Sequence, residues 1–180
     1  MRCILVLAVS SAFTLWIAPA HGAPKLKTDS SSREAEEILA SIDNSCSEIA
    51  DTAYRLNDQA FRLRDPEGHL DGLATLRGEI NRVGRELQVL DAQRDSLAEW
   101  EGRALNEIYP LLHDAAVNAD RAIDVYNSDR THLFASTYMD DTAKISQDTS
   151  RAAALLHNYL RLAKTREKES RLEESLGELQ

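Results

Sequence analysis

The sequence predicts an all-α protein, an antiparallel up-down four-helix bundle with long, coiled-coil-like helices. Three observations support this fold class. Apolar or small residues recur at alternating steps of four and three, which is the heptad rhythm of helices that pack on one another. Only 7 glycines and 4 prolines occur in 180 residues, which disfavours a sheet with many turns. The hydrophobic share of 43% is that of an ordinary globular chain, so disorder throughout is not expected.

The N-terminus predicts export. Arg2 is followed by an apolar run over residues 3–18, which is typical of a secretory signal peptide and short for a membrane span. Small residues allow cleavage after Ala20 or after Gly22, and an uncleaved N-terminal anchor is the alternative. We therefore expect a periplasmic or extracellular protein. The predicted segments are a signal peptide (1–22), a linker (23–30), a bundle domain (31–165) and a charged helical C-terminal tail (166–180).

The first helix has the most regular pattern. Ser31 and Glu34 have the spacing of a capping box, so the helix should begin at Ser31 or Ser32 and stop near residues 65–68, around Pro66. Its apolar seam comprises Ala35, Leu39, Ile42, Cys46, Ile49, Ala53, Leu56, Ala60 and Leu63.

The second helix continues the rhythm but contains Gly72, Gly78 and Gly84. Each glycine costs about 1 kcal/mol relative to alanine inside a helix, and the three either permit a close helix approach or mark a soft helix. Arg94 occupies one slot of the stripe, where we expect the core to end. The predicted stripe is Leu73, Leu76, Ile80, Val83, Leu87, Leu90 and Leu97.

The third helix is expected from about Leu97 to Tyr126. Asp95-Ser96 indicates a restart, with Ser96 and Glu99 at capping-box spacing, and a continuous helix is the alternative. Pro110 lies inside this helix, where it removes one hydrogen bond and favours a kink that can open a cavity. The stripe comprises Leu105, Ile108, Leu112, Ala115, Ala119, Ala122 and Tyr126.

The fourth helix should begin near Thr131, after polar turn residues at 127–129. Short connections between long helices predict antiparallel neighbours. Its stripe comprises Tyr138, Thr142, Ile145, Thr149, Ala152, Leu156, Tyr159 and Ala163.

The tail leaves this stripe. Leu172, Leu176 and Leu179 fall on a second stripe that extends back through Leu162 and Leu155. We interpret these three leucines as a contact for a partner or a second copy of the chain, docked as an amphipathic helix. A frayed, soluble end is the alternative.

Composition and motifs indicate binding and not catalysis. The formal net charge is −9, and no basic face for nucleic acid or for an anionic membrane is visible, so we expect neither partner. No Glu lies three residues before a histidine, and zinc, haem, nucleophile-elbow and phosphate-loop motifs are missing. The sequence therefore predicts no catalytic residues, no metal ligands and no cofactor. His113 and His157 are interpreted as residues of polar helix faces or helix ends.

One cysteine and two aromatic residues also have a predicted place in the bundle. Cleavage of the signal peptide would leave a single cysteine, Cys46, so an internal disulfide is ruled out. Because Cys46 lies on the seam, it is expected to act as a small apolar core residue. Trp100 and Phe134 lie near predicted helix ends, where they either plug the bundle or line a pocket.

These observations predict an exported interaction or adaptor protein that binds another protein, or itself, through its helical faces or its C-terminal tail. The alternative is an extracytoplasmic, sensor-like bundle that binds a small ligand in a cavity near Pro110.

Overall fold

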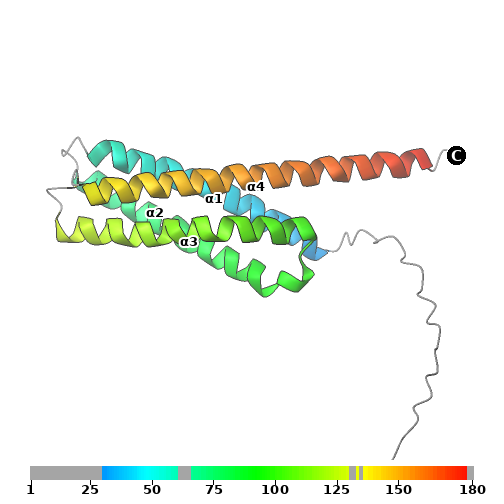
Figure 1. The fold of residues 1–180 in the computed structure, drawn as a ribbon, viewed down its shortest axis with the longest axis horizontal. Helices are drawn as coiled ribbons and strands as arrows, with labels where there is room; N and C mark the ends of the chain where they lie inside the picture. Colours follow the sequence, from blue (N-terminus) through cyan, green and yellow to red (C-terminus); the bar gives the residue numbers. More distant parts are fainter. Residues whose placement is uncertain (1–29, 61–65, 130–132, 134–135, 178–180) are drawn as a thin grey trace, which may run out of the picture.

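The computed structural model describes residues 30–60, 66–129, 133 and 136–177. The described residues form a four-helix bundle without strands, which confirms the predicted fold class (Figure 1). Each helix runs opposite to the one before it in the chain. The signal-peptide and linker predictions for residues 1–29 lie outside the described part. The elements are α1 (Ser30–Ala60), α2 (Pro66–Ala92), a short 3-10 turn (Arg94–Ser96), α3 (Glu99–Ser128) and α4 (Ser136–Gly177).

The seam of α1 is confirmed. Every predicted seam residue from Ala35 to Ala60 is buried, and Leu63 lies outside the described residues. The helix begins at Ser30, so Ser31 lies inside it and not at the predicted capping position. The described part of α1 runs to Ala60, residues 61–65 lie outside the described residues, and Pro66 begins α2. Proline suits the first position of a helix because the N–H that it lacks would be unpaired there anyway.

The predicted restart between the second and third helices is confirmed, but its cap was predicted wrongly. The hydroxyl of Ser96 donates to the carbonyl oxygen of Gln93 at 2.8 Å and does not cap α3. The α3 N-terminus is held instead by Glu101, whose Oε2 accepts the backbone N–H of Ala98 at 2.7 Å. Its Oε1 accepts the hydroxyl of Ser32 at 2.8 Å. The buried Glu101 carboxylate therefore joins the first turn of α3 to the first turn of α1.

The core lies along α4, which packs closely on both α1 and α3 (Figure 1). The predicted stripe of α4 is buried as far as Leu156, but Tyr159 is only half-buried and Leu160 takes its place in the core. A straight helix has 3.6 residues per turn, so it drifts away from a 3.5-residue repeat over several turns. The predicted α3 stripe is buried throughout, and the α2 stripe is buried except for half-buried Ile80 and Leu97.

Helix α2 is the least embedded of the four. It packs mainly on α1. Its interface with α3 is the smallest of the four main helix–helix interfaces in the described residues. Figure 1 shows it crossing the bundle obliquely. Its end carries no core residue beyond Leu90, and Arg94 is exposed, as predicted. Because α2 diverges from α3, the side of the bundle between these two helices is incompletely filled.

Candidate functional site: a cleft between α2 and α3 and a projecting α4

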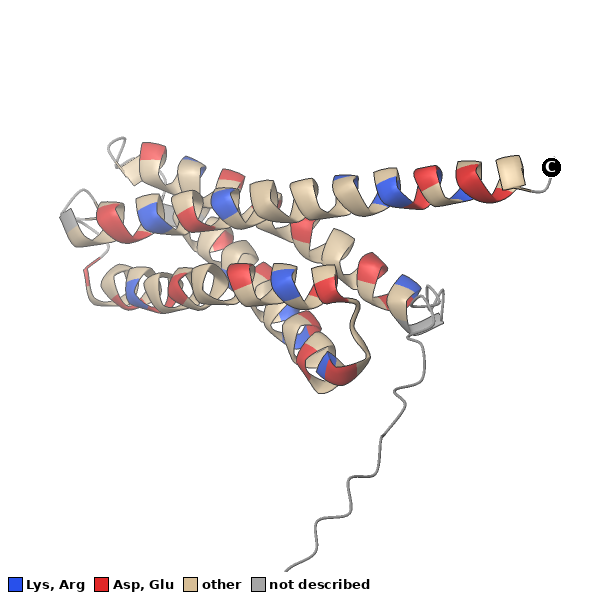
Figure 2. Cartoon of the chain, turned by 45° about the vertical axis from the view of Figure 1, so that its right-hand side comes forward, with Lys and Arg blue, Asp and Glu red and all other residues tan. Residues whose placement is uncertain are grey.

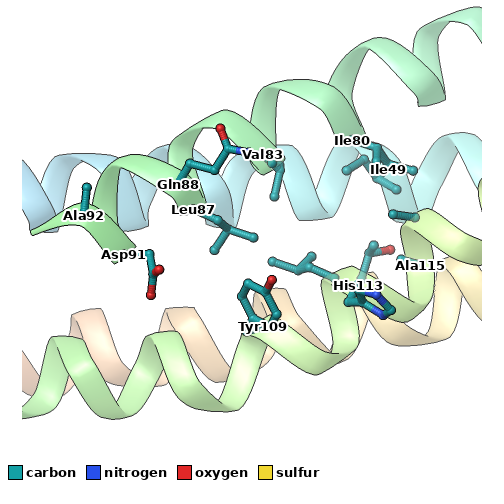
Figure 3. A pocket seen from close by; sticks show the side chains of 14 residues that line it. Ile49, Ile80, Val83, Leu87, Gln88, Asp91, Ala92, Tyr109, His113 and Ala115 are labelled. Atoms are coloured by element: carbon teal, nitrogen blue, oxygen red, sulfur yellow. The ribbon is translucent and has the colours of Figure 1, made fainter. Parts of the chain in front are cut away.

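A cavity of about 380 Å³ opens between α2 and α3 and reaches the other two helices (Figure 3). Its apolar floor includes Ile49 of α1, Val83 and Leu87 of α2 and Leu112 of α3, all of which are buried. The buried Thr149 of α4 also lines it. We call this cavity the α2/α3 cleft. All four helices thus contribute to one site.

The mouth of the cleft is polar. Figure 3 shows Leu87 and Asp91 directed from α2 into the gap, with the ring of Tyr109 on the side of α3. Gln88 and His113 also line the cleft, and both are exposed. An apolar floor with a few hydrogen-bonding groups at the entrance is the usual composition of a small-molecule site.

One end of the mouth is bridged by Arg94. Its guanidinium pairs with the Asp91 carboxylate at 2.9 Å and donates to Oδ1 of Asn106 on α3 at 2.7 Å. The carboxylate of Asp91 is therefore already engaged by a cation. These contacts connect the end of α2 to α3 beside the cleft.

The cleft borders Pro110, which lies inside α3. Tyr109, Leu112 and His113 line it from positions immediately around Pro110, and α3 continues through this proline as one helix. A cavity is therefore present near Pro110, as the ligand-binding alternative expects. Trp100 is half-buried, packs on the core and is not among the residues that line the cleft. Phe134, the other aromatic residue expected either to plug a bundle end or to line a pocket, lies outside the described residues.

A second hollow of about 400 Å³ lies farther along the same interface. Leu73 and Gly78 of α2 and Ile123 and Tyr126 of α3 are among its lining residues. Both hollows lie on the side of the bundle where α2 diverges from α3.

The three glycines of α2 have different surroundings. A Cβ added to Gly72 would lie 2.7 Å from Cδ2 of Leu56, so this glycine permits the close approach of α2 to α1. A Cβ added to Gly78 or Gly84 would meet nothing within 4 Å. Gly84 lines the cleft and Gly78 lines the second hollow. The close-approach interpretation therefore holds for Gly72 alone.

The other unusual feature is the end of α4. Burial ends at Leu160, and α4 continues to Gly177 past the ends of the other helices (Figure 1). We call residues 161–177 the α4 extension. Leu162, Leu172 and Leu176 are exposed on it, the last two at 63% and 62%. Leu179, the third predicted contact residue, lies outside the described residues.

Cys46 and the predicted surface histidines lie where the sequence places them. Cys46 is buried in the core, and burial, followed by the charges of Asp43 and Glu86, raises the pKa of its thiol to about 12. A thiol so far from ionisation is a poor nucleophile. His113 and His157 are both exposed.

His69 is a core residue that the sequence analysis missed. It is buried at the start of α2, and its Nδ1 lies 3.0 Å from the hydroxyl of Tyr138 on α4. Burial raises the pKa of this tyrosine, with a smaller contribution from Tyr126. The signal was available, because His69 stands four residues before Leu73 on the α2 stripe.

Two further properties concern metals and membranes. Within the described ranges, no group of three or more His, Cys, Asp or Glu side chains is arranged to hold a metal ion. None of the described helices contains an apolar stretch long enough to cross a bilayer.

No protein-family model, curated protein or solved structure matches the chain.

Proposed function

We propose that this protein is an exported interaction protein that acts by binding and not by catalysis, and that the α4 extension is its contact element. The observation that supports this proposal is the exposure of Leu172 and Leu176 on a helix that has left the core. The two leucines lie four residues apart, and Leu162 lies two heptads before Leu176, so all three share one stripe. A contact that covers this stripe would remove its leucines from water.

The extension also starts with an advantage over a free peptide. Nucleation is the costly step of helix formation, and the packed part of α4 has already completed it. Glu167 and Arg171 form an ion pair one turn apart on the exposed surface, which adds a small local contribution. A partner helix therefore meets a segment that is largely ordered before binding.

The charges of the extension favour a second copy of the chain as the partner. Residues 161–171 contain five basic and two acidic side chains, whereas residues 172–177 contain Glu173 and Glu174 and no basic side chain. Figure 2 shows this change of sign along the projecting part of α4. Two extensions paired antiparallel bring the basic part of each beside the acidic part of the other. Parallel pairing would bring like charges together, which disfavours it.

The expected assembly is a weak dimer. Seventeen helical residues, from Arg161 to Gly177, span about 25 Å at 1.5 Å per residue, which allows only a short interface. Thr165 and Glu169 occupy two slots of the leucine stripe, which lowers its apolar content further. Dimer formation should therefore depend on protein concentration, and on salt because opposite charges face each other across the contact.

The test is sedimentation velocity over a concentration series, with the unmodified protein, the double variant Leu172→Lys/Leu176→Lys and a chain truncated after Thr165. Val117→Lys is the matched control, because Val117 is an exposed apolar residue of α3 outside the extension. We expect the double leucine variant and the truncated chain to remain monomeric. The Val117→Lys control should form the dimer as the unmodified protein does. Glu173→Lys/Glu174→Lys should weaken it as well.

Two results would contradict the proposal at different levels. If the protein stays monomeric but captures another protein through Leu172 and Leu176, the contact element stands and self-pairing is wrong. If neither association nor capture depends on these leucines, the extension is only a soluble helix end.

A further inference from the structure

We infer that the α2/α3 cleft binds an uncharged amphiphile, a small molecule with an apolar body and a hydroxyl or carbonyl group at one end. This inference is independent of the α4 extension. It rests on the volume of the cleft, on the residues of its floor and mouth, and on the charges around them.

The cleft has the size of a ligand site and is open where a side chain would fill it. Its volume of about 380 Å³ falls within the range of roughly 300–1,000 Å³ that is usual for small-molecule pockets. Gly84 lies in its wall, and a Cβ at this position would meet nothing within 4 Å. Most other residues at position 84 would have a higher helix propensity than glycine and would fill part of the cleft. Glycine at this position instead keeps the cleft open. Unfilled apolar space forgoes packing contacts, which an apolar ligand would restore.

The floor of the cleft selects an apolar body. Ile49, Val83, Leu87 and Leu112 come from three different helices and together present aliphatic surface to the cavity. Transfer of an apolar group from water to this surface is favourable roughly in proportion to the area that it buries. Thr149 adds little polarity, because its hydroxyl already donates to the carbonyl oxygen of Ile145 at 2.7 Å.

The charges at the mouth select an uncharged polar end. Asp91 is the acidic residue among the lining side chains, and none of those side chains is a Lys or Arg. The Asp91 carboxylate is paired with Arg94, so the two charges compensate each other at the mouth. A carboxylate, phosphate or ammonium group of a ligand would therefore lose its hydration without meeting an unpaired opposite charge among the lining Asp, Glu, Lys or Arg side chains. Hydrogen-bonding groups remain at the mouth in Gln88, Tyr109 and His113, and they suit a hydroxyl or carbonyl group.

The experiment uses the chain without its predicted signal peptide, and two kinds of probe. Nile red, an uncharged dye whose fluorescence rises in apolar surroundings, reports occupation of the cleft. Displacement of the dye by 1-decanol and by decanoate compares an uncharged with an anionic end on the same apolar chain. We expect decanol to displace the dye at a concentration roughly tenfold or more below that of decanoate, which corresponds to about 1.4 kcal/mol.

Substitutions that fill the cleft locate the binding. Gly84→Leu places a side chain in the cleft from α2, and Ala116→Leu does so from α3. Gly102→Leu is the matched control, because a Cβ at Gly102 also meets nothing within 4 Å but this residue lines neither hollow. We expect each cleft variant to weaken dye binding roughly tenfold or more and the control to leave it unchanged. Circular dichroism and the melting temperature check that every variant is folded.

Three results would overturn the inference. Dye binding that survives both cleft variants would place the dye elsewhere on the protein. Equal loss in Gly102→Leu would show a general effect of added leucine. Displacement by decanoate as readily as by decanol would contradict an uncharged ligand. The double variant Leu172→Lys/Leu176→Lys should bind the dye normally, which separates this test from that of the α4 extension.

Discussion

Gly72 and Gly84 lie on the same helix in opposite surroundings, so alanine should shift the stability of the protein in opposite directions at the two positions. A Cβ at position 72 would lie 2.7 Å from Cδ2 and 3.2 Å from Cγ of Leu56, whereas a Cβ at position 84 would meet nothing within 4 Å. Real Cβ atoms do not approach other carbon atoms as closely as 2.7 Å. Leu56 must therefore move if Gly72 is replaced, and it is only 1% exposed.

The expected magnitudes follow from two opposing contributions. Replacing glycine by alanine inside a helix gains about 1 kcal/mol at either position. Overpacking of a well-filled core costs about 1–3 kcal/mol, and this cost applies at Gly72 alone. Gly84→Ala should therefore stabilise the protein by about 1 kcal/mol. Gly72→Ala should be neutral or destabilise it by up to about 2 kcal/mol once the helix gain is subtracted.

The assay is urea and thermal unfolding followed by far-ultraviolet circular dichroism. For a chain of this length, 1 kcal/mol shifts the melting temperature by about 2–4 °C, so the two variants should melt at clearly different temperatures. A double-mutant cycle with Leu56→Ala tests the cause. Leu56→Ala alone should cost about 2–5 kcal/mol, because it leaves a cavity in the core. With Leu56 shortened, Gly72→Ala should no longer be unfavourable.

The reasoning would be refuted if Gly72→Ala stabilised the protein as much as Gly84→Ala. If the effects of Gly72→Ala and Leu56→Ala on stability simply add in the double variant, the penalty at Gly72 does not come from contact with Leu56.

Three other predictions concern a thiol, a carboxyl group and the N-terminus. The thiol of Cys46, with its pKa raised to about 12 by burial, should react with a thiol-specific disulfide reagent only after unfolding, and rapid reaction of the native protein would contradict its core position. Burial, followed by repulsion from Asp114, raises the pKa of the Asp148 carboxyl above 3.8, so its contribution to stability is full below pH 3.8 and is lost as pH rises through the folded-state pKa. Asp148→Asn should therefore raise the melting temperature at neutral pH and change it little below pH 3.8, and a lower melting temperature at neutral pH would contradict this sign. Intact-mass spectrometry of the protein expressed from its full sequence should show cleavage after Ala20 or Gly22, whereas a full-length mass would favour the uncleaved anchor.

The sequence by itself determines the helices and their buried faces. The seam of α1 could be predicted residue by residue, from Ala35 to Ala60, because a heptad pattern repeated over so many turns admits one buried face. The break after α2 was also predictable, because Asp95-Ser96 indicates a helix restart, although a continuous helix was the alternative. The exposure of Leu172 and Leu176 agrees with the polar residues that replace the α4 stripe in the tail.

The tertiary structure alone decides how closely the helices approach. Periodicity shows which face of each helix is apolar, but it does not fix the angle at which α2 crosses the bundle. That angle sets Gly72 against Leu56 and leaves Gly84 beside open space, although both are glycines of one helix. It likewise opens the α2/α3 cleft, whose walls come from four helices that are far apart in the sequence. The contact of Glu101 with Ser32 joins residues 69 positions apart, and no local pattern specifies such a pair.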